Sequence, residues 1–236
     1  MSFILPRGVV LPVRKIDVNM VGTPHPYEAR NAAAIAANWD AEHKANPYLF
    51  NGTMVLMSRL ELKGDRLDGV CHPVQYATML YWRKNKGPHG VEHTFAFPAL
   101  VSRDNALVAI RMGKHTANPG RIYFAAGSFE PHDFVEGRAD LHGNMQREVM
   151  EETGLDISSV RRDLHDHIYS ENHSTVIFRR YWMDEDADVL ARRIEQFVAS
   201  EVQPEVEAPV VIRSGDMPVG MSPHMKAIVR WHFSGR

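Results

Sequence analysis

The chain has 236 residues, of which 44% are hydrophobic and 24% are charged, and its formal net charge is −2. These values are ordinary for a globular protein, and the length is sufficient for a full hydrophobic core. A nearly neutral chain lacks the basic surface that marks binding to nucleic acid or to an anionic membrane. The one cysteine, Cys71, excludes an intrachain disulfide and makes a cysteine-based zinc site a poor hypothesis.

The start of the chain does not have the pattern of a targeting segment. Residues 1–13 contain an apolar patch that Pro6 and Arg7 interrupt, without the basic start and continuous apolar core of a signal peptide. No stretch approaches the eighteen or more apolar residues that span a bilayer. We therefore expect a cytoplasmic protein that does not enter a membrane.

The first part of the chain predicts alternating strands and helices. Residues 9–18 favour a strand, and the alanine-rich residues 26–44 favour a helix. Residues 53–63 and 66–74 predict a β-hairpin around Gly64-Asp65, followed by a short helix at 75–85. The polar Gly/Pro run at 86–90 is the best candidate for a boundary. We place an N-terminal α+β extension at 1–90 and expect it to pack on a core domain at 91–236.

The predicted elements follow a different pattern in the core domain. We expect strands at 93–102, 105–111 and 121–126, a helix at 141–153, strand-like segments at 167–182, a helix at 187–200, a strand at 208–213 and a last helix at 222–233. Strands and helices mixed in this order predict an α/β fold in which helices cover a sheet.

The chemistry is concentrated in residues 147–155, which read Arg-Glu-Val-Met-Glu-Glu-Thr-Gly-Leu. Asp140 is suited to cap this helix at its start, and Gly154 to end it. The spacing puts Glu148, Glu151 and Glu152 on one helical face, where they repel unless cations are bound. Oxygen-seeking Mg²⁺ suits such a set. By themselves, three acidic residues at this spacing are more typical of a solvated helix face.

The complete string resembles the signature of the Nudix hydrolase family. That signature reads Gly, five residues, Glu, seven residues, Arg-Glu, an aliphatic residue, any residue, Glu-Glu, any residue, Gly and an aliphatic residue. Its second half matches 147–155 at every fixed position. The resemblance covers residues 91–236 and implies a Nudix-type α/β/α sandwich with a mixed sheet, to which the N-terminal α+β extension is added.

The first half of the signature is not matched. Counting back from Arg147, the signature glycine falls on Asp133 and the signature glutamate on Ala139. The turn at residues 125–131 resembles the family's Gly-Gly turn but lies farther from the helix, which indicates an insertion of about six residues within 128–139. In the family, the missing glutamate supports the geometry of the helix. Glu136 could fold back to replace it.

The resemblance implies roles for the conserved half of the signature. Glu148, Glu151 and Glu152 would bind Mg²⁺ or Mn²⁺, and the backbone carbonyl of Ala126 would add a ligand. Arg147 would orient the glutamates, and Glu148 or Glu151 would act as the base. The reaction implied is attack of a metal-activated water on phosphorus.

Other residues are candidates for contact with the substrate. Glu205 and Glu207 lie in a proline-bounded segment from which a further acidic side chain could reach the site, and Arg111 ends a strand where a basic group could meet phosphates. Each is as well explained as an exposed loop or strand-end charge. Aromatic side chains that could stack on a base, or simply belong to the core, are Tyr123, Phe124 and Trp182.

The function that we expect is hydrolysis of a diphosphate linkage in a nucleoside diphosphate joined to another moiety. The alternative is a Nudix-fold module that binds a nucleotide without cleaving it, and Ala139 with the insertion favours that alternative. The expected partner is a small nucleotide-like molecule, with no nucleic acid and no membrane, and a homodimer is left open. Residues 46–52 and Trp39 faintly resemble the extension of uridine diphosphate-sugar diphosphatases, although Asn-Pro and Asn-Gly are also common turn dipeptides.

Overall fold

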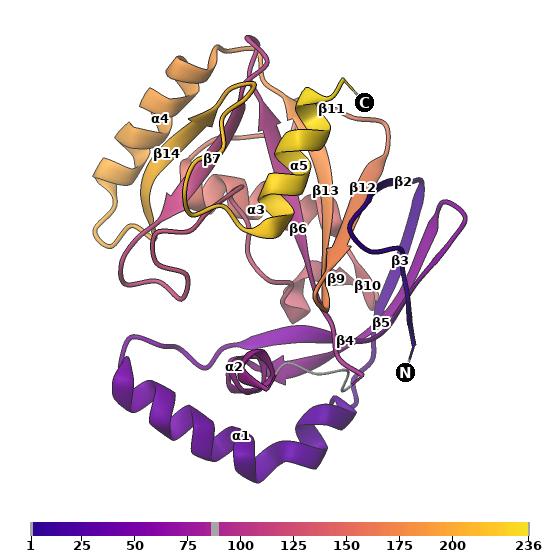
Figure 1. Ribbon diagram of the computed structural model, residues 1–236. Helices are drawn as coiled ribbons and strands as arrows, with labels where there is room; N and C mark the ends of the chain where they lie inside the picture. The colour runs from indigo at the N-terminus through magenta and orange to yellow at the C-terminus, as the bar shows by residue number, and fades with distance from the viewer. Residues whose placement is uncertain (1, 86–89, 236) are drawn as a thin grey trace.

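The computed structural model describes residues 2–85 and 90–235, which form two mixed β-sheets with helices packed against them (Figure 1). The first sheet has the order β14-β7-β6-β13-β12-β2, with β8 paired to β7 and β11 to β13. β6 and β13 run parallel, and the other pairs in this sheet are antiparallel. Its strands are β2 (Val10–Val13), β6 (His93–Val101), β7 (Leu107–Met112), β8 (Ile122–Tyr123), β11 (Arg161–Arg162), β12 (Asp166–Glu171), β13 (Ser174–Trp182) and β14 (Val206–Ile212).

The second sheet has the order β1-β4-β5-β3-β10-β9. Its strands are β1 (Phe3–Ile4), β3 (Lys15–Met20), β4 (Thr53–Lys63), β5 (Arg66–Gln75), β9 (Phe134–Val135) and β10 (Arg138–Ala139). β4 and β5 are the hairpin predicted at 53–63 and 66–74, and Gly64 takes a positive φ of 62° in its turn. A left-handed residue is what a tight hairpin turn requires, and glycine adopts it without a steric penalty.

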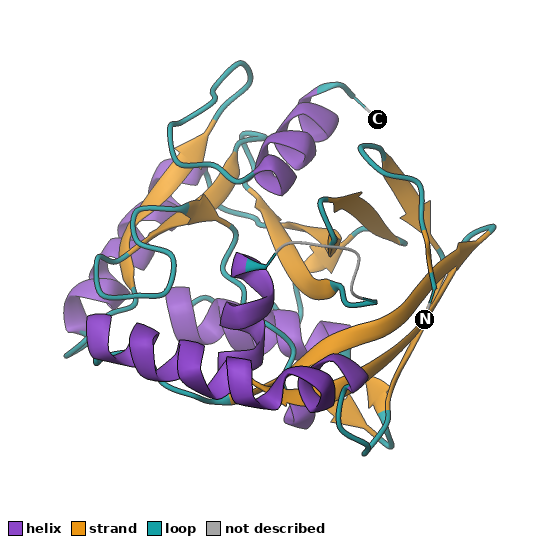
Figure 2. Cartoon of the chain, turned by 60° about the horizontal axis from the view of Figure 1, so that its bottom comes forward, coloured by secondary structure: helices purple, strands orange, loops and turns teal. Residues whose placement is uncertain are grey.

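The helices lie on three surfaces. α3 (Leu141–Thr153) and α4 (Ala187–Ser200) pack on one face of the first sheet, and α5 (Pro223–Phe233) packs on the other (Figure 1). α1 (Pro26–Ala45) and α2 (Tyr76–Lys84) lie beside the β4–β5 hairpin. Figure 2 is turned so that these two helices come toward the viewer. This mixed α/β architecture agrees with the predicted fold class. Among the described helices, none has the length and apolar character needed to cross a membrane.

Residues 2–85 are built into the same core as the rest of the chain. β2 pairs with β12, and β3 pairs with β10. The largest buried cluster contains Val18 and Val55 together with Ala96, Met145 and Leu190. The predicted domain boundary at 86–90 falls mainly on residues 86–89, which lie outside the described residues, so that boundary stays a prediction.

The strand predicted at 9–18 is divided between the two sheets. β2 ends at Val13, and the amides of Arg14 and Lys15 both donate to the carbonyl of Asp65, at 2.8 and 3.3 Å. The chain leaves one sheet and enters the other at this point. A pattern of apolar residues cannot show such a division, because both halves of the segment are extended.

The predicted insertion at 128–139 has an ordered structure of its own. It forms a 3₁₀ turn, η1 (Pro131–Asp133), and the short strands β9 and β10. Glu136, at φ 50°, and Gly137, at φ 77°, make the turn between the two strands. Glu136 is exposed at this turn, so the expectation that it folds back to replace the missing glutamate is wrong.

Candidate active site

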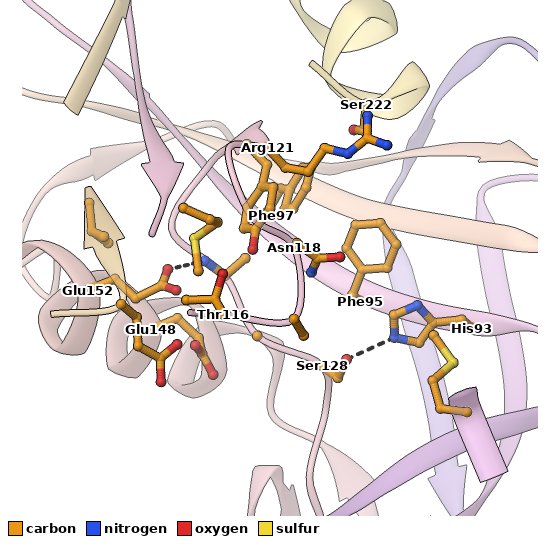
Figure 3. A pocket seen from close by; sticks show the side chains of 18 of the residues that line it. His93, Phe95, Phe97, Thr116, Asn118, Arg121, Ser128, Glu148, Glu152 and Ser222 are labelled. Carbon is orange, nitrogen blue, oxygen red and sulfur yellow. Dashed lines mark hydrogen bonds between the residues drawn. The ribbon is translucent and has the colours of Figure 1, made fainter. Parts of the chain in front are cut away.

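The cavity next to α3 is the principal candidate site. It has a volume of about 830 Å³ and collects side chains from α2, β6, β8, α3, the residues before β14 and the start of α5. Figure 3 shows Glu148 and Glu152 at one end and Phe95 and His93 at the other, with Thr116 and Asn118 between them. The cavity therefore has an acidic end and an aromatic end.

Helix α3 forms where the sequence predicts it, and its caps are those expected. Asp140 accepts a hydrogen bond from the Gly143 amide at 2.9 Å, which satisfies a free donor of the first turn. Gly154 ends the helix at φ 68°, where a side chain would be strained. Met145 and Val149 are buried beneath the helix, and this packing directs the carboxylates toward the cavity.

The three predicted carboxylates lie together at the acidic end but in different environments. Glu152 accepts a hydrogen bond of 2.7 Å from the Ala126 amide. Glu148 is nearly buried and lies 2.8 Å from Arg147 Nη2, while Glu151 is more than half exposed and pairs with Arg147 Nη1 at 3.0 Å. Arg147 thus contacts two of the three carboxylates, and its role in orienting them for a reaction stays a prediction. At Ala126, the contact in the structure is made by the amide group, and a role for its carbonyl stays a proposal.

Gly127 lies against the carboxyl group of Glu148. A Cβ atom added at Gly127 would lie 2.5 to 2.7 Å from the atoms of the Glu148 carboxyl group, closer than real Cβ contacts. The glycine therefore lets the end of the third core strand approach the carboxylate.

Burial and mutual repulsion change the acidity of these groups. Burial, followed by the nearby Glu148 charge, raises the pKa of Glu152 to about 8. Burial raises the pKa of Glu148 to about 7 against the opposing effect of Arg147. Carboxylates that resist ionisation when crowded are those that a divalent cation would stabilise in the charged form.

The donor set fits a hard cation, although it is not arranged around one. In the part of the chain that the structure describes, no group of three or more His, Cys, Asp or Glu side chains is gathered closely enough to hold a metal ion. Arg147 and the Ala126 amide occupy carboxylate oxygens that would otherwise be available. All the candidate side-chain ligands are carboxylates on one rigid helix, which is the ligand type that Mg²⁺ and Mn²⁺ prefer.

Asp133 is a further residue of the site that sequence reasoning missed. It lies in η1 with only 2% of its side chain exposed, and its Oδ1 is 3.0 Å from Arg147 Nη2. Counting back from Arg147 along the signature puts a glycine at the position of Asp133. The resemblance therefore gives the Asp133 carboxylate no role. The available signal was an acidic residue in the inserted segment fourteen positions before Arg147.

The aromatic end is formed by β6 and α2, and Tyr123 of β8 extends the aromatic wall toward the carboxylates. Phe97 and Tyr123 stack with parallel rings 6.2 Å apart, and Phe95 meets Phe97 edge to face. Trp82 lines the cavity from α2. Tyr123 was expected to be available for stacking, and it is at the cavity wall, whereas Phe124 is buried in the core between the first sheet and α5. Trp182, the third aromatic candidate, does not line the cavity and is instead covered by the guanidinium groups of neighbouring arginines.

A histidine contributes polarity to this wall. His93 Nε2 lies 3.0 Å from the Ser128 hydroxyl (Figure 3). Burial is the largest cause that lowers the pKa of His93, to about 3, with a further contribution from Arg83. The ring is therefore neutral at physiological pH and can donate or accept a hydrogen bond.

The remaining predicted contacts are only partly brought to the cavity. Glu205 lines it, but Glu207 does not. Arg111 is also absent from the lining, because neighbouring side chains of a strand point to opposite faces and Met112 is the one that faces the cavity. Arg121 lines the cavity instead and is the basic group closest in role to the one predicted (Figure 3).

The loop at 46–52 supports α2 from outside the cavity. The Asn51 side chain accepts a hydrogen bond of 2.9 Å from the Ala77 amide at the start of α2. Asn46 accepts from the Tyr48 amide in a local turn, as the common turn interpretation of this segment predicts. Trp39 stacks on His43 along α1 and does not line the cavity.

Comparisons with known proteins give matches among solved structures only. No family model and no curated protein matches the chain. The structure of DR0079 from Deinococcus radiodurans is 11% identical, covers 60% of this chain and 83% of its own, and has a TM-score of 0.39. A MutT protein from Methanosarcina mazei is 12% identical over 61% of this chain and 94% of its own, with a TM-score of 0.39. The E. coli ORF135 protein is 17% identical over 63% and 94%, with a TM-score of 0.38.

Of these three neighbours, the protein from Methanosarcina mazei is described as a MutT protein. The chain has a mixed α/β fold in which residues 147–155 lie on α3 and the following loop, at the edge of a cavity. Because the identities and TM-scores are low, these solved structures do not establish an activity for the chain.

Proposed function

We propose that the chain is a hydrolase that uses Mg²⁺ or Mn²⁺ to cleave the diphosphate linkage of a nucleoside diphosphate joined to another moiety. The observation that carries the proposal is the cluster of Glu148, Glu151 and Glu152 on one helix at the acidic end of a cavity of about 830 Å³. A cavity of this volume is within the range that binds small molecules. The aromatic end is suited to a flat, partly apolar group such as a nucleobase.

The acidic side chains are the proposed cation ligands. Glu148, Glu151 and Glu152 would bind the ion, with the Ala126 carbonyl as a further donor and Glu205 as an additional acidic group at the cavity wall. Such an ion, when bound, supplies positive charge against the diphosphate oxygens and makes water a better nucleophile.

The residues of the chain position and move the other groups. Arg147 fixes Glu148 and Glu151 through separate nitrogens, and either glutamate can accept the proton that the attacking water loses. Arg121 lines the cavity with its side chain directed toward Ser222 and away from Glu148 and Glu152 (Figure 3), so it would contact a part of the substrate beyond the carboxylates. The aromatic side chains of Phe95 and Phe97 would contact the other end of the substrate, so that its diphosphate lies near the carboxylates.

A large cavity beyond the acidic end favours a substrate with a bulky group on each side of the diphosphate. A terminal phosphate would leave much of this space unfilled. We therefore rank nucleotide sugars and dinucleotides above nucleoside triphosphates as substrates.

The test is a screen over nucleoside triphosphates, nucleotide sugars, dinucleotides and coenzyme A, each with Mg²⁺, with Mn²⁺ and with EDTA. A matched pair of variants controls it: Glu148→Gln in the site, and Glu195→Gln on the exposed surface of α4. We expect Glu148→Gln to lower turnover by roughly two to four orders of magnitude and Glu195→Gln to leave it unchanged. Binding of a nucleotide without turnover of any compound would replace this proposal with the non-catalytic binding module.

A further inference from the structure

We infer that Asp133 is the positioning residue of the site, which sets Arg147, and through it Glu148, in the orientation that a bound cation requires. This inference rests on the proposed function and identifies what replaces the signature glutamate that is absent at Ala139.

One guanidinium nitrogen joins Asp133 to the proposed cation ligand. Arg147 Nη2 lies 3.0 Å from Asp133 Oδ1 and 2.8 Å from Glu148 Oε1. Nη1 of the same side chain is 3.0 Å from Glu151 Oε2. An arginine held on both edges of its planar group has little rotational freedom, so the location of Asp133 determines where the two glutamates are held.

Asp133 is itself held by several donors. Its Oδ2 accepts hydrogen bonds from the Asn144 side chain at 3.0 Å and from the Glu130 amide at 2.8 Å. Its backbone carbonyl accepts from the Asp140 amide, the cap residue of α3, at 2.7 Å. The side chain is 2% exposed, so water does not compete for these bonds. A buried carboxylate with this many fixed partners is a rigid support for Arg147.

Asp133 reaches this position because the inserted segment is fixed at both ends. The Phe129 carbonyl accepts from the Val55 amide at 3.0 Å, and the Gly137 carbonyl accepts from the Met20 amide at 2.8 Å. β10 then pairs with β3. Strands from the N-terminal part of the chain thus hold the insertion against α3. At Ala139 the corresponding side chain is a methyl group that cannot accept a hydrogen bond.

The experiment measures Mn²⁺ binding to the full chain without substrate, by electron paramagnetic resonance of the free ion, together with the melting temperature. Asp133→Asn keeps the size of the side chain and removes its charge. The control is Asp166→Asn, since Asp166 forms a largely buried pair with Arg179 at 2.6 Å and does not line the cavity. Turnover of the best substrate from the screen is measured for the same variants.

We expect Asp133→Asn to raise the Kd for Mn²⁺ and to lower kcat by roughly 10- to 100-fold each, as is typical when the partner of a metal ligand is lost. Asp133→Glu should recover part of both. Asp166→Asn should lower the melting temperature and leave the Kd for Mn²⁺ unchanged. The double variant Asp133→Asn with Arg147→Gln distinguishes a positioning role of Asp133 from a simple loss of negative charge. If Asp133 acts through Arg147, its substitution has no further effect on Mn²⁺ binding in the Arg147→Gln background.

Three results would overturn the inference, and only the last of them also overturns the proposed function. If Asp133→Asn binds Mn²⁺ as the wild-type chain does, Asp133 has only a structural role and the proposed function is unaffected. If the full effect of Asp133→Asn on Mn²⁺ binding persists in the Arg147→Gln background, that effect comes from the lost charge alone. The inference is then wrong, and the proposed function is again unaffected. If the wild-type chain neither binds Mn²⁺ nor cleaves any compound of the screen, the proposed function fails, and the inference fails with it.

Discussion

Gly127→Ala tests the geometry of the site with the smallest change that the structure offers. The added methyl group would meet the carboxyl atoms of Glu148 at 2.5 to 2.7 Å, and recovery of an ordinary contact of about 3.4 Å requires the carboxylate to move by about 0.7 to 0.9 Å. A displacement of about 1 Å in a catalytic group can cost about 100-fold in rate. We therefore expect kcat/KM to fall about 100-fold, equivalent to about 2.7 kcal/mol of activation free energy.

The assay compares kcat/KM and the melting temperature of Gly127→Ala with those of Gly22→Ala. Gly22 is a suitable control, because no atom lies within 4 Å of a Cβ placed there and its φ is not positive. Neither substitution should lower the melting temperature by more than a few degrees. Glu148→Asp shortens the side chain by one methylene group and relieves the clash, so the double variant should lose less activity than the product of the two single effects. A Gly127→Ala chain with wild-type kcat/KM would show that the position of Glu148 does not limit the reaction, and the steric reasoning would be wrong.

Four further predictions can be checked on the purified chain. EDTA should abolish turnover, and addition of Mg²⁺ or Mn²⁺ should restore it, measured as product release; activity that persists in excess chelator would contradict a metal requirement. Arg121→Gln should raise KM at least tenfold, while Arg111→Gln, on the other face of its strand, should leave KM unchanged. Steady-state kinetics measures both values, and a larger rise in KM for Arg111→Gln than for Arg121→Gln would show that Arg111 is the substrate contact. Burial lowers the pKa of His25 to about 4, so this ring is neutral in the folded chain and binds a proton more readily in the unfolded chain. The contribution of His25 to the free energy of unfolding is therefore present above pH 6.5 and is lost as the pH falls toward 4. Melting curves should therefore show the wild type losing stability relative to His25→Asn over that range, and parallel curves would refute the assignment. Removal of residues 1–90 should yield an unfolded chain, because β2 and β3 complete both sheets; a folded, active product of limited proteolysis would disprove this.

The parts of the fold that the sequence predicts are those with a strong local pattern. The helix at 141–153 has an apolar face, a capping aspartate and a terminal glycine, and it begins and ends where these residues indicate. The hairpin at 53–63 and 66–74 has long apolar strands around a Gly-Asp turn, and both strands form. In each case the residues that determine the element are within the element itself.

The parts that could not be predicted depend on distant segments. β9 and β10 have two residues each, too few for any periodicity, and exist because β3 offers an edge on which β10 pairs. The third core strand, expected at 121–126, is only two residues long, and the Ala126 amide beyond its end donates to the side chain of Glu152 on α3. Asp133 belongs to the site for the same kind of reason, since Asn144 and Arg147, which contact its carboxylate, come from α3.

The placement of the insertion between β3 and α3 has a consequence for how the protein folds. Asn19 must meet Arg138, Val55 must meet Phe129, and β2 must meet β12 before Asp133 has a fixed position. These pairings close loops of more than seventy residues, and such non-local contacts slow folding because chain entropy is lost before they form. We expect α3 to form early from its own caps and the orientation of Arg147 to be completed late. Refolding followed by tryptophan fluorescence should therefore recover compact structure before Mn²⁺ affinity returns.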